Sequence, residues 1–260
     1  FGVSKIDEEI NWSNVEIRSY DVFDGSGNWS TVENWRDGEL PSENANVYVL
    51  SSLTINEDED ITTGTVTIQG DGNITINGSL TANNVYDKTE AGALCINDGG
   101  QLRQNNQNLN GKFVMNIVKG DWSAENETTG WQFISSPIKN APISQFIPAD
   151  QAQGDYDLYK YNGAEDMEWI NHKSHIEDFE KEFFSGRAYL ASLEIAETVT
   201  LSGKLNAETT FARQLSYNAD KQIPFSGARR CSAVLSAQGI IWLAINRSGT
   251  LIPVIAHLFS

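Results

Sequence analysis

The sequence predicts an all-β protein in which a short right-handed parallel β-helix is followed by a small antiparallel β-sandwich. Between residues 47 and 102 the apolar residues fall singly or in alternating pairs, separated by Gly and Asn. Short β-branched runs between turn residues are typical of strands. Only residues 173–181 have a composition that suits a helix, and that segment is short and acidic.

Residues 66–82 provide the best example of this pattern, because short strands and Gly or Asn corners follow one another without a gap. Three such strands with their corners make a coil of about twenty residues, and stacked coils bury an apolar column that no single coil can bury. We therefore expect three to four coils. A β-sandwich of short antiparallel strands is the alternative, since its turns recur at a similar interval.

The chain divides into two predicted domains, a stacked-coil domain over residues 1–120 and a C-terminal β-sandwich domain over residues 121–260. Residues 120–130 lack apolar periodicity and separate the two. In the second domain residues 156–161 alternate strictly, and Asn162-Gly163 predicts a hairpin. The tail from about residue 204 is poor in acids, and its composition does not match that of the preceding chain. It forms either central strands of the second sheet or an unnatural or truncated end.

The charge is strongly negative, at −17 for 260 residues. Nucleic acid is excluded as a partner, because phosphate binding needs clustered Lys and Arg. No run of about twenty apolar residues occurs, so we expect no membrane span. The acidic first half, rich in Asn, Thr, Ser and Gly, is typical of an extracellular β protein. We therefore expect an extracellular or outer cell surface location.

Four tryptophans are the candidate ligand-binding residues, because an exposed indole ring can stack on a sugar: Trp29, Trp35, Trp122 and Trp169. For the pair at positions 29 and 35 a structural role is the competing interpretation. Large flat side chains cover apolar surface well, so these two rings would close the open end of the β core.

Four consecutive carboxylates, Glu57, Asp58, Glu59 and Asp60, are the candidate metal site. Their mutual repulsion is relieved either by solvent or by a hard cation such as calcium. No other cofactor is expected. His172 and His175 form an HxxH pair, which lacks the spacing of a zinc-binding helix and is interpreted as two solvated histidines.

No catalytic residue is assigned. The sequence contains neither a nucleophile motif nor a phosphate-binding glycine loop. Enzymes that cleave polysaccharides on a β-helix use carboxylates gathered across coils. Asp71, Asp87 and Asp98 qualify only by elimination, so we expect a protein that is not an enzyme.

Two passages resemble secreted, adhesin-like β-helical surface proteins of Bacteroidota-type bacteria. The first is Gly27-Asn-Trp-Ser, Asn34-Trp-Arg and Gly38-Glu-Leu-Pro41, similar to a motif found ahead of their coils. The second runs from Gly130-Trp-Gln-Phe to residues 156–161 and is similar to a β-sandwich module that follows those coils. The resemblance implies architecture and location rather than a reaction.

These observations predict a non-catalytic cell-surface or secreted module, adhesin-like or structural, that presents a rigid β surface to an extracellular glycan or a host or matrix protein. The alternative is a carbohydrate-binding module or a glycan-degrading β-helix enzyme.

Overall fold

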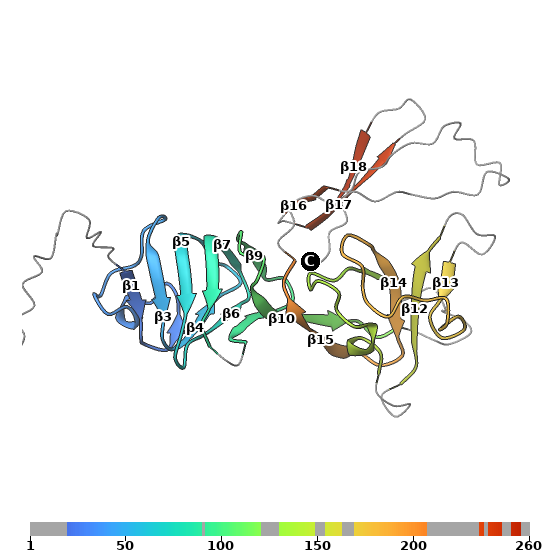
Figure 1. The fold of residues 1–260 in the computed structure, drawn as a ribbon, viewed down its shortest axis with the longest axis horizontal. Coiled ribbons are helices and arrows are strands. Elements are labelled where there is room, and N and C mark those ends of the chain that lie inside the picture. The colour runs from blue at the N-terminus through green and yellow to red at the C-terminus, as the bar shows by residue number, and fades with distance from the viewer. Residues whose placement is uncertain are drawn as a thin grey trace, which may run out of the picture.

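The structure is a computed structural model that describes residues 20–89, 92–120, 130–148, 154–162, 169–206, 234–236, 239–245 and 251–255. It is all-β, as predicted, and its first part is a β-solenoid of about three turns. Figure 1 shows the solenoid stacked along the long axis of the molecule, with a second β unit at its far end.

The solenoid strands alternate between two sheets along the chain. One sheet has the order β1 (Tyr20–Phe23), β3 (Asn46–Val49), β5 (Asp60–Ile68), β7 (Ser79–Asp87) and β9 (Gln101–Arg103). The other contains β2 (Gly27–Asn28), β4 (Ser52–Ile55), β6 (Asn73–Ile76), β8 (Leu94–Ile96) and β10 (Asn110–Ile117). All neighbours within these two sets pair in parallel.

The strand register stacks inward apolar residues of one coil on those of the next. The buried columns run from Val47 to Val66 to Val85, and from Leu53 to Ile74 to Leu94. Because side chains alternate along a strand, the intervening Thr54 and Thr75 point outward. The alternation that predicted these strands is therefore the alternation between the core and the outer surface of the solenoid.

Glycine is required where one coil passes close to the backbone of its neighbour. A Cβ at Gly78 would collide with the carbonyl oxygen of Asn56, and one at Gly72 with that of Val49. At the corner between coils the Asn97 amide donates a hydrogen bond of 2.8 Å to the side-chain oxygen of Asn77. Gly and Asn at the corners thus set the spacing between coils.

Strand β15 (Glu197–Lys204) joins the second part of the chain to the solenoid. It pairs antiparallel with β10 along eight residues, from Asn110 opposite Lys204 to Ile117 opposite Glu197. The second solenoid sheet thereby becomes six-stranded, and its order is β15-β10-β8-β6-β4-β2. The pairing crosses the boundary expected near residue 120, and one hydrophobic cluster extends from Phe23 to Leu205.

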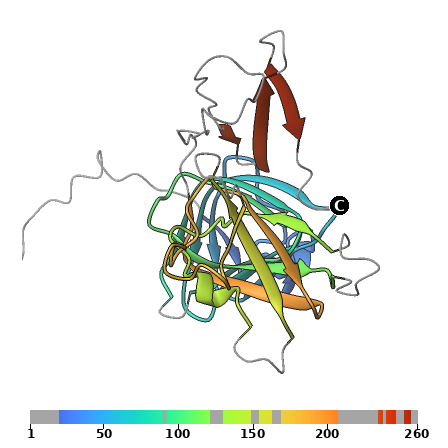
Figure 2. The same ribbon diagram turned by 90° about the vertical axis from the view of Figure 1, so that its right-hand side faces the viewer.

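The second unit is built on an antiparallel sheet with the order β11 (Gln132–Ile134), β14 (Tyr189–Leu193), β12 (Tyr156–Tyr161) and β13 (Trp169–Asn171). Figure 2 views the molecule from this end. Strands β12 and β13 pair antiparallel, as the expected hairpin requires, while residues 163–168 between them lie outside the described residues. Two short 3₁₀ turns, η2 (Val32–Asn34) and η3 (Ile143–Gln145), lie in the first coil and before β12 respectively.

Two expectations are wrong. Residues 173–181 form turns and bends and not a helix, because Phe179 packs into the core, where its ring contacts His172 at 5.0 Å. Of the two alternatives given for the tail, that of central strands in the second sheet is wrong for the part of the tail that the structure describes. Its strands β16 (Val234–Ser236), β17 (Gly239–Ile245) and β18 (Leu251–Ile255) form a separate three-stranded antiparallel sheet.

In the part of the chain that the structure describes, no helix has the length and apolar character needed to cross a bilayer.

Candidate functional site

The two tryptophans of the first coil are core residues. Trp29 and Trp35 are each only 3% exposed, and their ring centroids lie 4.9 Å apart at 70°. Phe23 packs edge-on against Trp35 at 5.2 Å. Neither indole offers a face to a sugar, which corrects their assignment as ligand-binding residues. The competing interpretation, that the rings close the end of the β core, agrees with this packing.

The remaining residues of this first motif hold the same turn together. The Asn34 side-chain amide donates to the carbonyl oxygen of Asn28, and the backbone carbonyl oxygen of Asn34 accepts the N–H groups of Asp24 and Gly25. A Cβ at Gly25 would overlap Asn34, so only glycine fits there. The motif is therefore a determinant of the fold.

The four carboxylates of residues 57–60 do not converge. Glu59 accepts hydrogen bonds from the backbone N–H groups of Asn56 (2.6 Å) and Ser30 (3.2 Å), which ties the corner between β4 and β5 to the first coil. Glu57, Asp58 and Asp60 are exposed. Among the described residues no three His, Cys, Asp or Glu side chains are grouped to hold a metal, so the predicted calcium site at this cluster is not formed.

Trp169 belongs to an aromatic face on the outer side of the second unit's sheet. In the strand register Phe133 lies in one row with Tyr159, and Tyr161 lies opposite Trp169. The Trp169 ring contacts Tyr161 at 5.2 Å and Phe133 at 6.4 Å, and Trp131 contacts Tyr159 at 5.7 Å. We define these five residues as the aromatic face. It reaches from edge to edge of the sheet.

Three of these rings are open to solvent, with Phe133 52%, Tyr161 45% and Trp169 37% exposed. The opposite side of the sheet packs into the core through apolar residues such as Leu158 and Ala191. Rings exposed on a sheet whose other side is buried can contact an apolar surface of a ligand without any rearrangement of the fold. The arrangement suits binding.

Polar groups lie beside the aromatic rings on the same face. Alternation along β12 and β13 puts Asp157 next to Tyr159 and Asn171 next to Trp169. The Asn171 amide donates to Asp157 at 2.6 Å, and the Lys173 ammonium lies 3.2 Å from the same carboxylate. The aromatic face therefore has hydrogen-bonding groups directly beside its apolar rings.

A buried ionic network holds this sheet from below. The Glu180 carboxylate, 7% exposed, accepts from Lys160 at 2.9 Å, from Arg187 at 2.6 Å and from the Tyr189 hydroxyl at 2.8 Å. Burial by itself would raise the pKa of Glu180, but the hydrogen bonds from Lys160, Tyr189 and Arg187 lower it below its ordinary value. Burial raises the pKa of Tyr189. The network keeps β12 and β14 in place under the aromatic face.

The two histidines do not form a pair. His172 is buried, and its Nδ1 lies 2.9 Å from the Tyr156 hydroxyl. Burial lowers its pKa, although nearby Glu180 acts in the opposite direction. His175 lies 3.0 Å from the Ser174 hydroxyl. The interpretation as two solvated histidines is therefore wrong for His172, which is a core residue.

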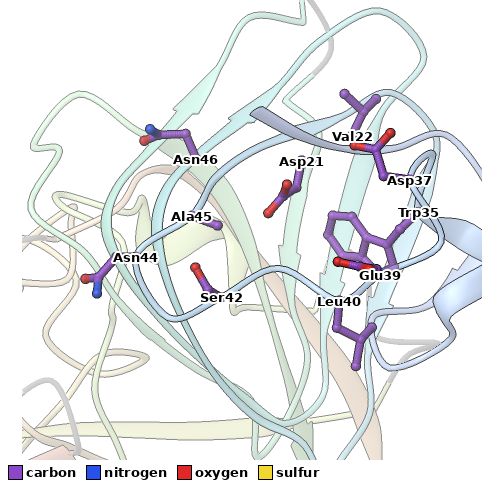
Figure 3. A pocket seen from close by; sticks show the side chains of 10 residues that line it. All are labelled: Asp21, Val22, Trp35, Asp37, Glu39, Leu40, Ser42, Asn44, Ala45 and Asn46. Carbon is purple, nitrogen blue, oxygen red and sulfur yellow. The ribbon is translucent and has the colours of Figure 1, made fainter. Parts of the chain in front are cut away.

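An acidic cavity of about 430 Å³ opens beside the first coil. Figure 3 shows the carboxylates of Asp21, Asp37 and Glu39 around it, with Trp35 forming part of the wall. Partial burial raises the pKa of Asp21, and the charges of Asp37 and Glu39 raise it further. The cavity therefore favours a cation or a neutral hydrogen-bonding ligand over an anion.

The three carboxylates considered as catalytic candidates by elimination, Asp71, Asp87 and Asp98, have different local surroundings. Asp87 accepts three hydrogen bonds, from the N–H and hydroxyl of Thr89 and from the N–H of Ala93, and so stabilises a turn. Asp98 accepts the N–H of Asn116 at 3.3 Å. Asp71 is exposed at a corner.

Sequence reasoning identified Trp169 but missed its neighbours Trp131, Phe133, Tyr159 and Tyr161. The signal was present, because aromatic residues alternate at 131 and 133 and again at 159 and 161. Only the strand order reveals that these pairs share one face. Trp122, the fourth candidate, lies outside the described residues.

Fold and site together define a β-solenoid protein whose last coil is joined to an antiparallel sheet with an exposed aromatic face. The family described as "Domain of unknown function (DUF8693)" matches residues 22–234, and the chain belongs to that family. The match covers the solenoid and the second unit together. No curated protein and no solved structure matches the chain.

Proposed function

We propose that this chain is a non-catalytic module of an extracellular or cell-surface protein, adhesin-like in character, in which the solenoid is a rigid support and the aromatic face binds a glycan or a host or matrix protein. The exposure of Phe133, Tyr161 and Trp169 on one sheet is the observation that carries the proposal. Exposed aromatic residues gathered in one patch are characteristic of interaction sites.

The location rests on composition and resemblance. The charge of −17 keeps such a surface soluble and disfavours nucleic acid. The passages at residues 27–41 and 130–161 resemble secreted, adhesin-like β-helical proteins of Bacteroidota-type bacteria, which supports the same location.

Two finer points of architecture belong to the proposal. The coils wind right-handed, because connections between parallel strands of one sheet have this hand in nearly all known cases. The second unit is a small antiparallel β-sandwich, an architecture that would bury the inner side of the four-stranded sheet.

A binding screen on the purified chain tests the proposal. The panel contains glycans and matrix proteins, with and without millimolar calcium. We expect saturable binding to at least one partner that needs no calcium, because the described residues hold no grouped carboxylate site. Absence of binding to both classes of partner would contradict the proposal.

The acidic cavity favours one second candidate, a glycan-degrading enzyme. Glycoside hydrolysis needs one protonated and one ionised carboxyl group, and burial together with the charges of Asp37 and Glu39 raises the pKa of Asp21 above its ordinary value. Release of reducing sugars from a glycan panel, lost in Asp21→Asn and in Glu39→Gln, would support this candidate. No release would leave the binding module as the better account.

A further inference from the structure

We propose that the aromatic face binds a single neutral glycan chain. The inference rests on the proposed function and names the class of ligand for the same site.

The three exposed rings by themselves cover less area than one side of a stable protein interface. An aromatic side chain presents about 150–250 Å², so the exposed fractions of Phe133, Tyr161 and Trp169 amount to roughly 300 Å². A stable protein interface needs about 800 Å² from each partner. The patch matches the contact area of a few sugar units instead.

The ring geometry fits a flexible chain and not a flat polymer surface. The Trp169 centroid lies 5.2 Å from Tyr161 and 6.4 Å from Phe133, about the length of one pyranose ring in each case. The ring planes differ by 60° and 44°. A ligand that touches all three rings must therefore turn along its length, which a soluble oligosaccharide does and a crystalline polymer surface does not.

The polar groups supply the second half of sugar recognition. A pyranose presents C–H groups on its faces and hydroxyls at its rim, so it needs apolar rings with hydrogen-bonding groups beside them. Three such groups lie next to the rings. The Asp157 carboxylate accepts from the Asn171 amide at 2.6 Å and lies 3.2 Å from the Lys173 ammonium. They are ordered before the ligand arrives, which reduces the entropy lost on binding.

Charge selects among glycans. The chain carries −17, and the Lys173 ammonium beside the rings is already engaged by Asp155 and Asp157. A uronic acid polymer or a sulfated glycan would be repelled at long range. A neutral hexose chain has no such penalty, and it is the ligand that we infer.

The test is titration calorimetry of the full chain with neutral hexose oligosaccharides, with a uronic acid oligomer of equal length, and with crystalline cellulose as a pull-down. Trp169→Ala and Tyr161→Ala should each weaken binding of the neutral oligosaccharide at least about tenfold, because aromatic anchors carry most of the energy of small interfaces. Trp169→Phe should bind within about threefold of the parent, since a ring remains.

Matched controls are Tyr86→Ala on the solenoid and Phe184→Ala on the second unit, since both side chains are 38% exposed and neither belongs to the aromatic face. Both should bind like the parent. Far-UV circular dichroism and denaturant unfolding of every variant establish that each is folded.

The outcomes separate the two proposals. Neutral glycan binding that is lost in Trp169→Ala and kept in Tyr86→Ala and Phe184→Ala supports the inference. Glycan binding that is unaffected by Trp169→Ala, preference for the uronic acid oligomer or crystalline polymer, or binding only to a matrix protein overturns it and leaves the binding module standing. No binding to any glycan or matrix protein overturns both.

Discussion

The indole Nε1 of Trp35 donates a hydrogen bond of 2.8 Å to the backbone carbonyl oxygen of Trp29, inside the first coil of the solenoid. Both residues are buried, so the bond satisfies a carbonyl that has no access to water. Trp29 and Trp35, which the sequence predicted as candidate ligand-binding residues, thus stabilise the fold. Trp169, on the aromatic face, is exposed and can contact a ligand.

Substitution of Trp35 should therefore destabilise the fold without changing the aromatic face. We expect Trp35→Ala to lower the free energy of unfolding by about 3–5 kcal/mol, because it removes a large core side chain. Trp169→Ala should cost about 1 kcal/mol or less, as for other exposed positions. Urea unfolding measures both, and equal losses in the two variants would contradict the division of roles.

Glycine at position 78 should be essential for coil stacking. Gly78→Ala places a Cβ against the backbone carbonyl oxygen of Asn56, and a backbone atom cannot move aside as a flexible side chain can. We expect the free energy of unfolding to fall by about 2–3 kcal/mol. The control is Gly70→Asn, because Gly70 has φ of 62° and open space around it, and Asn tolerates that conformation. Thermal unfolding should separate the two variants clearly, and similar midpoints would show that the close approach is unimportant.

Glu180 should make stability depend on pH in the acid range. Its pKa is below its ordinary value in the folded state, so the stabilisation is present above pH 4.5 and is lost as the pH falls through the folded pKa. Glu180→Gln leaves Lys160 and Arg187 without their carboxylate, and we expect a loss of about 3 kcal/mol at neutral pH.

Denaturant unfolding between pH 7 and pH 3 measures this difference, which should shrink below pH 4.5. The matched control is Asp24→Asn, which breaks the exposed pair with Arg36 at 2.9 Å and should cost less than about 1 kcal/mol. A gap between the parent and Glu180→Gln that stays constant down to pH 3 would argue against an ionised Glu180 in the folded protein.

The solenoid and the second unit should unfold together, because β15 pairs with β10 and the core is continuous. We expect one calorimetric transition with equal calorimetric and van't Hoff enthalpies. Leu201→Ala, in the buried side of β15, should shift that whole transition through a loss of about 2–5 kcal/mol. Two separate transitions, only one of them moved by Leu201→Ala, would indicate independent units.

The sequence by itself determined the local structure of this protein. Alternating residues such as Val47 and Val49 predicted strands because a strand places successive side chains on opposite faces. Gly and Asn predicted the corners for equally local reasons, and residues 162–163 predicted their hairpin. Each of these properties depends on a few neighbouring residues, so each can be derived from the order of amino acids alone.

Only the tertiary structure decided what lies next to what. Residues 198–203 fall within the predicted C-terminal domain but pair with β10 of the solenoid, because strand pairing joins segments far apart in the chain and alternation does not specify the partner. For the same reason a tryptophan in the sequence has no defined exposure. Trp35 is buried by Phe23 and Trp29, while Trp169 joins Phe133 and Tyr161 on an open face, and long-range packing alone makes that difference.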